Sequence, residues 1–181
     1  MRWNRQAQWF VMLTWLLLSG CALCTSVVQA NVKKDDLIGA LRESGHFDTY
    51  LSELEKADLT GKLSGAGPFT LFAPTDGAFA RMPEEKRSVL FEPEHAAELK
   101  NLLRYHVVPG RIPAEEVGMA GHVQALTQQV DIRRYDGQLM VNAARVVVPA
   151  TQVSNGVLYG IDEVLIPHFQ NLFLPDPTDR P

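Results

Sequence analysis

The chain has 181 residues, 46% of them hydrophobic, and it carries 17 Lys and Arg against 21 Asp and Glu. The basic residues are scattered, so the chain lacks the basic face that displaces counterions from phosphates, which excludes a nucleic-acid binder. Residues 31–181 are numerous enough for one domain with its own hydrophobic core.

The first 30 residues differ from the rest of the chain. They contain no acidic residue, and Arg2 and Arg5 precede an apolar run at residues 9–18. A basic start followed by a short apolar stretch and small residues is typical of an export signal, so residues 1–30 are predicted to be a signal peptide. Removing these two arginines leaves 15 basic against 21 acidic residues, a net charge of −6.

Two sites in this leader could be cut. Leu18 to Cys21 (LSGC) resembles the bacterial lipobox, in which the cysteine becomes the lipidated first residue. Residues 28–30 (VQA) resemble an ordinary signal-peptidase site, with cleavage after Ala30. The sequence leaves both sites open, together with an uncut anchor helix over roughly residues 9–28. Both cysteines lie in the leader, so the remaining domain has no disulfide.

The domain begins with two predicted helices. Residues 35–44 form a short one, opened by acidic residues and closed by Gly45. A second one has an apolar stripe at helical spacing, made of Phe47, Tyr50, Leu51 and Leu54. Residues 59–67 are turn-rich and end this helical part.

A short buried strand is predicted at residues 68–73 (PFTLFA), where Pro74 follows and disfavours helical backbone. Thr75 or Asp76 is a natural N-cap for the turn after it.

Two more helices are predicted, one starting at Pro83 and a longer one over residues 94–105. Its apolar face is predicted to hold Leu99, Leu102, Leu103 and His106. Residues 107–110 are predicted to end this helix and to form an extended segment.

Strands dominate the last third of the domain. Asp136-Gly137 supplies a two-residue hairpin turn. The predicted strands are residues 130–135, 138–142, 145–149, 156–161 and 164–167. Helices first and strands later indicate an α+β domain. Residues 168–181 are predicted to be a flexible tail that contains Pro175, Pro177 and Pro181.

Three segments together resemble the fasciclin (FAS1) domain family. Residues 69–79 (FTLFAPTDGAF) resemble its first motif, residues 102–110 (LLRYHVVPG) its Tyr-His motif, and residues 155–167 (NGVLYGIDEVLIP) its closing strand pair. Their order and spacing match the family over residues 32–167. The closing segment departs from it at Tyr159 and the glycine that follows, where the family usually has His or a similar residue.

The resemblance implies a FAS1-like wedge of about seven β-strands with several helices packed against it. It also implies an extracellular or envelope-bound protein associated with adhesion rather than with a fixed reaction. The motif residues expected to shape the fold are Phe72, Pro74, Thr75, Asp76, Phe79, Asn155 and Gly156.

Tyr105 and His106 are candidate binding residues, because a Tyr-His pair is an integrin-adhesion determinant in some animal members of the family. His106, however, falls on the apolar face of the 94–105 helix, which favours a buried structural role. A buried imidazole needs hydrogen-bond partners, and the turn at Thr75 and Asp76 is the expected one.

A second candidate binding surface is the predicted hairpin. Arg133, Arg134 and Tyr135, with Arg145 nearby, could meet acidic or sugar groups. An ordinary solvated hairpin would explain the same residues.

No catalytic residue, metal site or cofactor is predicted. Asp76 has no second carboxylate or nucleophile at a suitable spacing, and capping explains it. The sequence has no nucleophile elbow and no phosphate-binding glycine loop. The histidines are scattered, without the spacing of metal ligands, at His46, His95, His106, His122 and His168.

The sequence therefore predicts an exported, non-enzymatic binding or adhesion module in the periplasm, outer envelope or extracellular space. The expected partner is a surface protein, a glycan or another copy of the chain, and the membrane is reached only through a possible lipid anchor on Cys21. The alternatives are a small-ligand carrier or an enzyme with a pocket between helices and sheet, and a purely structural envelope protein.

Overall fold

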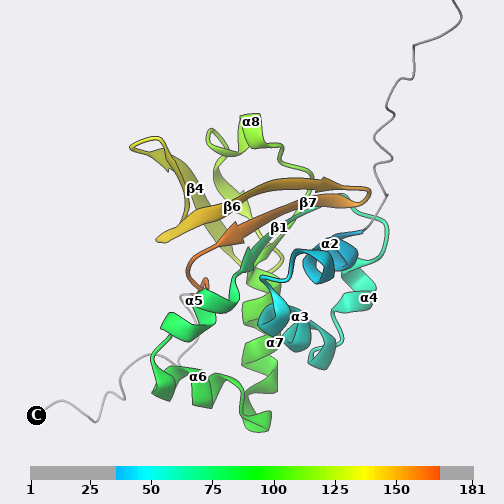
Figure 1. Cartoon of the computed structure of the whole chain (residues 1–181), viewed down its shortest axis with the longest axis vertical. Coiled ribbons are helices and arrows are strands. Elements are labelled where there is room, and N and C mark those ends of the chain that lie inside the picture. Colours follow the sequence, from blue (N-terminus) through cyan, green and yellow to red (C-terminus); the bar gives the residue numbers. More distant parts are fainter. Residues whose placement is uncertain (1–35, 168–181) are drawn as a thin grey trace, which may run out of the picture. The chain divides into compact units, whose positions relative to one another are not determined.

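The computed structural model describes residues 36–167 (Figure 1). The predicted signal peptide at residues 1–30, with Cys21, and the predicted tail at residues 168–181 lie outside the described residues. No helix within the described part is long and apolar enough to cross a membrane.

The described strands form one sheet in the order β2-β1-β7-β6-β5-β4-β3. Their bounds are β1 Phe69–Pro74, β2 Val107–Pro109, β3 Gly121–Gln124, β4 Gln129–Tyr135, β5 Gln138–Val141, β6 Ala144–Val153 and β7 Gly156–Ile161. Neighbours are antiparallel, except for the central pair β1 and β7, which is parallel. A hydrogen bond from the Leu126 N–H to the Val107 carbonyl oxygen joins the loop after β3 to β2, so the sheet is nearly closed.

Helices precede and interrupt the strands. They are α2 Leu37–Ser44, α3 Asp48–Lys56, α4 Thr60–Leu63, α5 Asp76–Arg81, α6 Glu84–Leu90, the 3₁₀ turn η1 Pro93–His95, α7 Ala96–Tyr105 and α8 Ala114–Val117. As predicted, an acidic residue opens α2 and a glycine ends it: the Asp36 carboxylate accepts a hydrogen bond from the Gly39 N–H, and Gly45 has φ +63°. The prediction of an α+β fold with about seven strands is confirmed.

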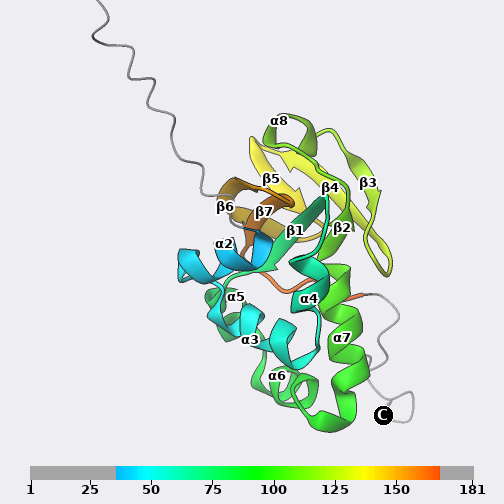
Figure 2. The same cartoon turned by 90° about the vertical axis from the view of Figure 1, so that its right-hand side faces the viewer.

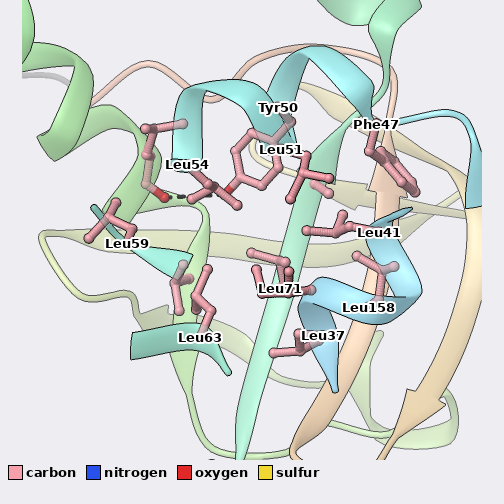
Figure 3. Close-up of a cluster of buried hydrophobic side chains, with 14 of the residues drawn as sticks. Leu37, Leu41, Phe47, Tyr50, Leu51, Leu54, Leu59, Leu63, Leu71 and Leu158 are labelled. Carbon is pink, nitrogen blue, oxygen red and sulfur yellow. Dashed lines mark hydrogen bonds between the residues drawn. The ribbon is translucent and has the colours of Figure 1, made fainter. Parts of the chain in front are cut away.

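The central strands are buried on both faces, because α2 to α7 lie on one side of them and the curled sheet encloses the other (Figures 1 and 2). Leu71 and Leu158 face the helices and pack with side chains such as Leu41 (Figure 3). The next residue of each strand points the other way, since side chains alternate along a strand. Phe72 and Tyr159 thus stack inside the sheet, with ring centroids 5.3 Å apart.

By contrast, β3, β4, β5 and the first half of β6 bury only their inner face. Val130, Ile132, Val141 and Ala144 point inward and belong to the second core cluster. The residues between them point away from the helical layer, and the hairpin of β4 and β5 projects from it in Figure 1. One side of this half of the sheet is therefore open to solvent.

Several predicted elements differ from the structure. The predicted strand at residues 164–167 is wrong: the segment has no strand pairing, and the Leu165 N–H instead donates to a histidine nitrogen. The turn-rich residues 59–67 contain the short helix α4. The helix predicted over residues 94–105 begins as the 3₁₀ turn η1, which starts at Pro93. The short elements α8 and β3 were not predicted, because four residues are too few to show a period.

Candidate functional site

Thr75 and Asp76 cap two different helices. The Thr75 hydroxyl oxygen accepts a hydrogen bond from the Ala78 N–H at 3.3 Å and caps α5. The Asp76 carboxylate instead accepts from the Thr49 N–H at 2.8 Å and from the Asp48 N–H at 3.3 Å. These donors belong to the first turn of α3, whose own N-cap residue makes no side-chain cap. Asp76 therefore fixes α3 from a distant part of the chain.

This hydrogen bonding also keeps the Asp76 carboxyl group ionised. Its partial burial acts to raise the pKa, but hydrogen bonds from Thr49 and Asp48 and the charge of His46 together lower the pKa below its ordinary value. A carboxylate whose oxygens accept backbone N–H groups serves a structural purpose. Asp76 caps α3, however, and it is Thr75 that caps the turn after β1 for which either residue was predicted.

Phe72, Pro74 and Phe79 are buried where the first motif meets the sheet and the helices. Pro74 is the last residue of β1 and pairs with Ile161 of β7. Phe79, on α5, packs against Phe91 with ring centroids 6.1 Å apart. The apolar residues of this motif thus hold the end of β1 in place.

Tyr105 is 1% exposed, so its ring is not presented to solvent. Its hydroxyl donates to the Gln129 carbonyl oxygen at 2.9 Å and accepts from the Asn142 side-chain amide at 3.0 Å. Asn142, which has φ +55°, also accepts from the Asp131 N–H through its side-chain oxygen. Tyr105 thereby joins the end of α7 to β4 and to the turn between β5 and β6. The sequence carried no signal for Asn142, since the contact joins positions 37 residues apart.

His106 lies in the core with 0% of its surface exposed. Its Nδ1 is 2.8 Å from the Leu102 carbonyl oxygen, and its Nε2 accepts a hydrogen bond from the Leu165 N–H at 2.9 Å. This pairing assigns the proton to Nδ1 of a neutral ring. The prediction that the turn at Thr75 and Asp76 supplies the partner is wrong. Because α7 ends at Tyr105, His106 reaches instead the segment that follows β7.

Acid should destabilise the domain through His106. Burial lowers the pKa of this imidazole from 6.5 to about 4, although the hydrogen bond to Leu102 acts to raise it. The unfolded chain therefore binds a proton on His106 more readily than the folded chain does. The stability that the neutral, buried imidazole provides is complete above pH 6.5 and is lost as the pH falls toward 4. Between pH 7.5 and pH 5 the free energy of unfolding should drop by about 2 kcal/mol from this residue alone.

Urea denaturation of the wild type and of His106→Gln at both pH values measures this loss. Glutamine can still accept from the Leu165 N–H but does not titrate, so the stability gap between the two proteins should narrow by about 2 kcal/mol at pH 5. An equal gap at both pH values would contradict the assignment of a neutral, buried imidazole.

Asn155 and Gly156 join the turn between β6 and β7 to the helical layer. The Asn155 side-chain oxygen accepts from the Leu37 N–H at 2.9 Å, at the start of α2. Its amide donates to the carbonyl oxygens of Leu63 at 2.6 Å and of Gly65 at 3.1 Å, at the end of α4. Gly156 pairs in register with Phe69 of β1.

The candidate hairpin residues do not share one face. Arg133 is opposite Met140 of β5, which is itself opposite Arg145 of β6, so these three side chains form a row across three strands. Tyr135 lies on the same open face, two residues along β4, and is 72% exposed. Arg134 points to the other side, where its guanidinium lies beside Gly118. Met140 was missed, although strict alternation from Arg133 through the hairpin would have placed it there.

The described part of the chain also has surface hollows. Hollows of 220 Å³ beside α5 and 190 Å³ beside α3 are smaller than usual ligand pockets. A hollow of 440 Å³ is lined by residues 64–68, Ser154 and Asn155. No strand residue lines any of these three hollows.

Within residues 36–167, no three His, Cys, Asp or Glu side chains gather closely enough to hold a metal ion.

Comparisons with known proteins agree with this architecture. The fasciclin domain matches residues 45–167. Protein sll1483 of Synechocystis sp. is 41% identical over 122 residues, which are 67% of this chain and 67% of that protein. Human periostin is 32% identical over 131 residues, covering 70% of this chain but 15% of periostin. Fasciclin-like arabinogalactan protein 17 of Arabidopsis thaliana is 34% identical over 148 residues, covering 75% of this chain and 32% of the relative.

A solved structure of a FAS1 domain pair from the insect cell adhesion molecule fasciclin I superposes on this one with a TM-score of 0.64. It covers 73% of this chain and 51% of that chain at 15% identity, which establishes a shared fold. The sequence match over residues 45–167 and this fold together show that the chain belongs to the fasciclin (FAS1) domain family.

Proposed function

We propose that this protein is an exported, non-enzymatic binding module of the cell envelope. The observation that carries the proposal is that one part of the domain holds the fold together while another is left open. The polar side chains of the family motifs are used inside the fold, whereas the outer face of β3 to β6 is open to solvent. Family membership supports a role in adhesion, since one relative of known structure is a cell adhesion molecule.

The internal use of the motif side chains argues against catalysis. Both nitrogens of His106 have backbone partners, so the imidazole has no free site for a substrate proton. The Asp76 carboxylate caps α3, and the Asn155 side chain bonds three backbone groups. Structural roles therefore explain the presence of His106, Asp76 and Asn155 without a catalytic function.

Export is tested by fractionating the native host and measuring the intact mass of the protein in its membrane and soluble fractions. We expect either a membrane species that begins at Cys21 with added acyl mass or a soluble species that begins at Asn31. Cys21→Ser should release the first species from the membrane, whereas the matched variant Cys24→Ser should not. An uncut chain in the cytoplasm would overturn the proposal of export.

Binding is tested by applying the purified, folded protein to intact cells of the same host and to their isolated envelopes. Saturable retention, competed by unlabelled protein, is the expected result. No retention on either material would overturn the proposed binding function. A partner that is a surface protein, a glycan or the protein itself would each be consistent with it.

A further inference from the structure

The outer face of β4, β5 and β6 carries two arginines in one row across the strands. Arg133, Met140 and Arg145 are paired in register across the three strands, so the two guanidinium groups project from strands two apart. Strands in a sheet are about 4.8 Å apart, which separates the bases of these arginines by about 10 Å. Their side chains are 60% and 67% exposed. This spacing suits a partner with repeated negative charges rather than a single small anion.

Each of these arginines forms an ion pair with an acidic residue, and both ion pairs are weak. Arg133 makes an ion pair of 2.9 Å with Asp131, and Arg145 one of 3.9 Å with Asp162, both carboxylates being half-buried. Ion pairs at a protein surface contribute little to stability, so an incoming anion can compete with the two carboxylates for the exposed guanidinium groups. Asp162 is shared between several groups, because its carboxylate also accepts from the Arg145 backbone N–H at 2.7 Å and lies 3.8 Å from the Arg81 guanidinium. Both guanidinium groups are therefore available to a ligand.

An aromatic ring lies beside this row. Tyr135 is 72% exposed and pairs with Gln138, whose amide donates to the Val146 carbonyl oxygen. Val147, the residue after that carbonyl, is 51% exposed. Tyrosine offers an apolar ring with a polar tip, and such a ring can pack against the C–H face of a sugar while its hydroxyl bonds a sugar hydroxyl. The two arginines thus have an adjoining aromatic ring on which a sugar ring can pack.

The rest of the open face is polar. Gln124 and Gln129 pair across β3 and β4, and His122 pairs with Asp131. Stable protein–protein interfaces bury about 800 Å² on each partner around an apolar centre, and this face supplies few large apolar side chains, namely Tyr135, Val147 and the half-buried Met140. Amide, imidazole and guanidinium groups around one aromatic ring suit a ligand that is rich in hydroxyl groups and negatively charged.

We propose that the outer face of β4, β5 and β6 binds an anionic polysaccharide, with Arg133 and Arg145 contacting its acidic groups and Tyr135 packing on a sugar ring. This inference rests on the proposed binding function and names its face and its class of partner.

The test measures binding of the full exported chain to three polymers of matched length: alginate, neutral dextran and poly-L-glutamate. We expect alginate to bind, to bind more weakly as salt rises, and to bind better than both others. The double variant Arg133→Gln/Arg145→Gln should lose about tenfold or more in affinity, and Tyr135→Ala about fivefold. The matched control Arg42→Gln/Lys100→Gln, which removes two exposed cations from α2 and α7, should stay within about twofold.

Three results would overturn the inference. They are the absence of alginate binding, equal binding of alginate and poly-L-glutamate, and equal loss of affinity in the face and control variants. Retention of the protein on host envelopes shows whether only this inference has failed or the proposed binding function has failed as well. If the Arg133→Gln/Arg145→Gln protein is retained as well as the wild type, the binding module stands and uses another face. Circular dichroism of each variant confirms that its outward-facing substitutions leave the domain folded.

Discussion

Gly156→Ala is expected to lower the free energy of unfolding by more than about 3 kcal/mol and to leave little folded protein. A Cβ at this position would overlap the carbonyl oxygen of Phe69 and lie 3.0 Å from its carbonyl carbon. It would also lie 3.1 Å from a methyl group of Leu37. The first obstacle is backbone of β1, paired in register with β7 at the centre of the sheet. Relief therefore requires the two central strands to separate.

Chemical denaturation followed by circular dichroism measures this effect, with Gly61→Ala as the matched control. Gly61 lies in α4 with nothing within 4 Å of its added Cβ, so the same change should be neutral or stabilise the domain by up to about 1 kcal/mol. A Gly156→Ala protein with the denaturation midpoint of the wild type would show that β1 and β7 do not approach as closely as described.

Asn155→Asp is expected to destabilise the domain by about 3 kcal/mol at pH 7, more than Asn155→Ala does. The aspartate keeps the shape and can still accept from the Leu37 N–H. It cannot donate to the carbonyl oxygens of Leu63 and Gly65, and it places a negative charge against both. Alanine loses the same bonds but adds no charge, and water can reach this half-buried site.

The difference between the two variants should depend on pH. The carbonyl oxygens around the new carboxylate raise its pKa in the folded state above the value in the unfolded state. The loss of stability that the charge causes is therefore complete above the folded-state pKa and becomes smaller as the pH falls below it. Urea denaturation at pH 7 and pH 4 tests this, with the exposed Asn101→Asp on α7 as a control for the added charge. If Asn155→Asp and Asn155→Ala were equally stable at both pH values, the amide would not be donating to Leu63 and Gly65.

Local chemistry explains why much of the fold could be predicted from sequence. The stripe of Tyr50, Leu51 and Leu54 indicated α3, and the Asp136-Gly137 turn indicated the hairpin of β4 and β5, since each signal comes from residues close together in the chain. The motif around Phe72 and the Tyr-His motif indicated the family, which the comparisons confirm. The burial expected of His106 follows from the same helical period, and the structure places it in the core.

The sequence by itself determined the helical stripes, the hairpin and the family, because these depend on neighbours along the chain. Only the tertiary structure decided which backbone groups His106 and Asp76 bond, since Leu165 and Thr49 lie 59 and 27 residues away. It also decided that the face shared by Arg133 and Arg145 is the open one. Strand alternation alone separates Arg133 from Arg134, but the pairing of β5 with β6 and the half of the sheet that the helices cover are not encoded in a short-range pattern.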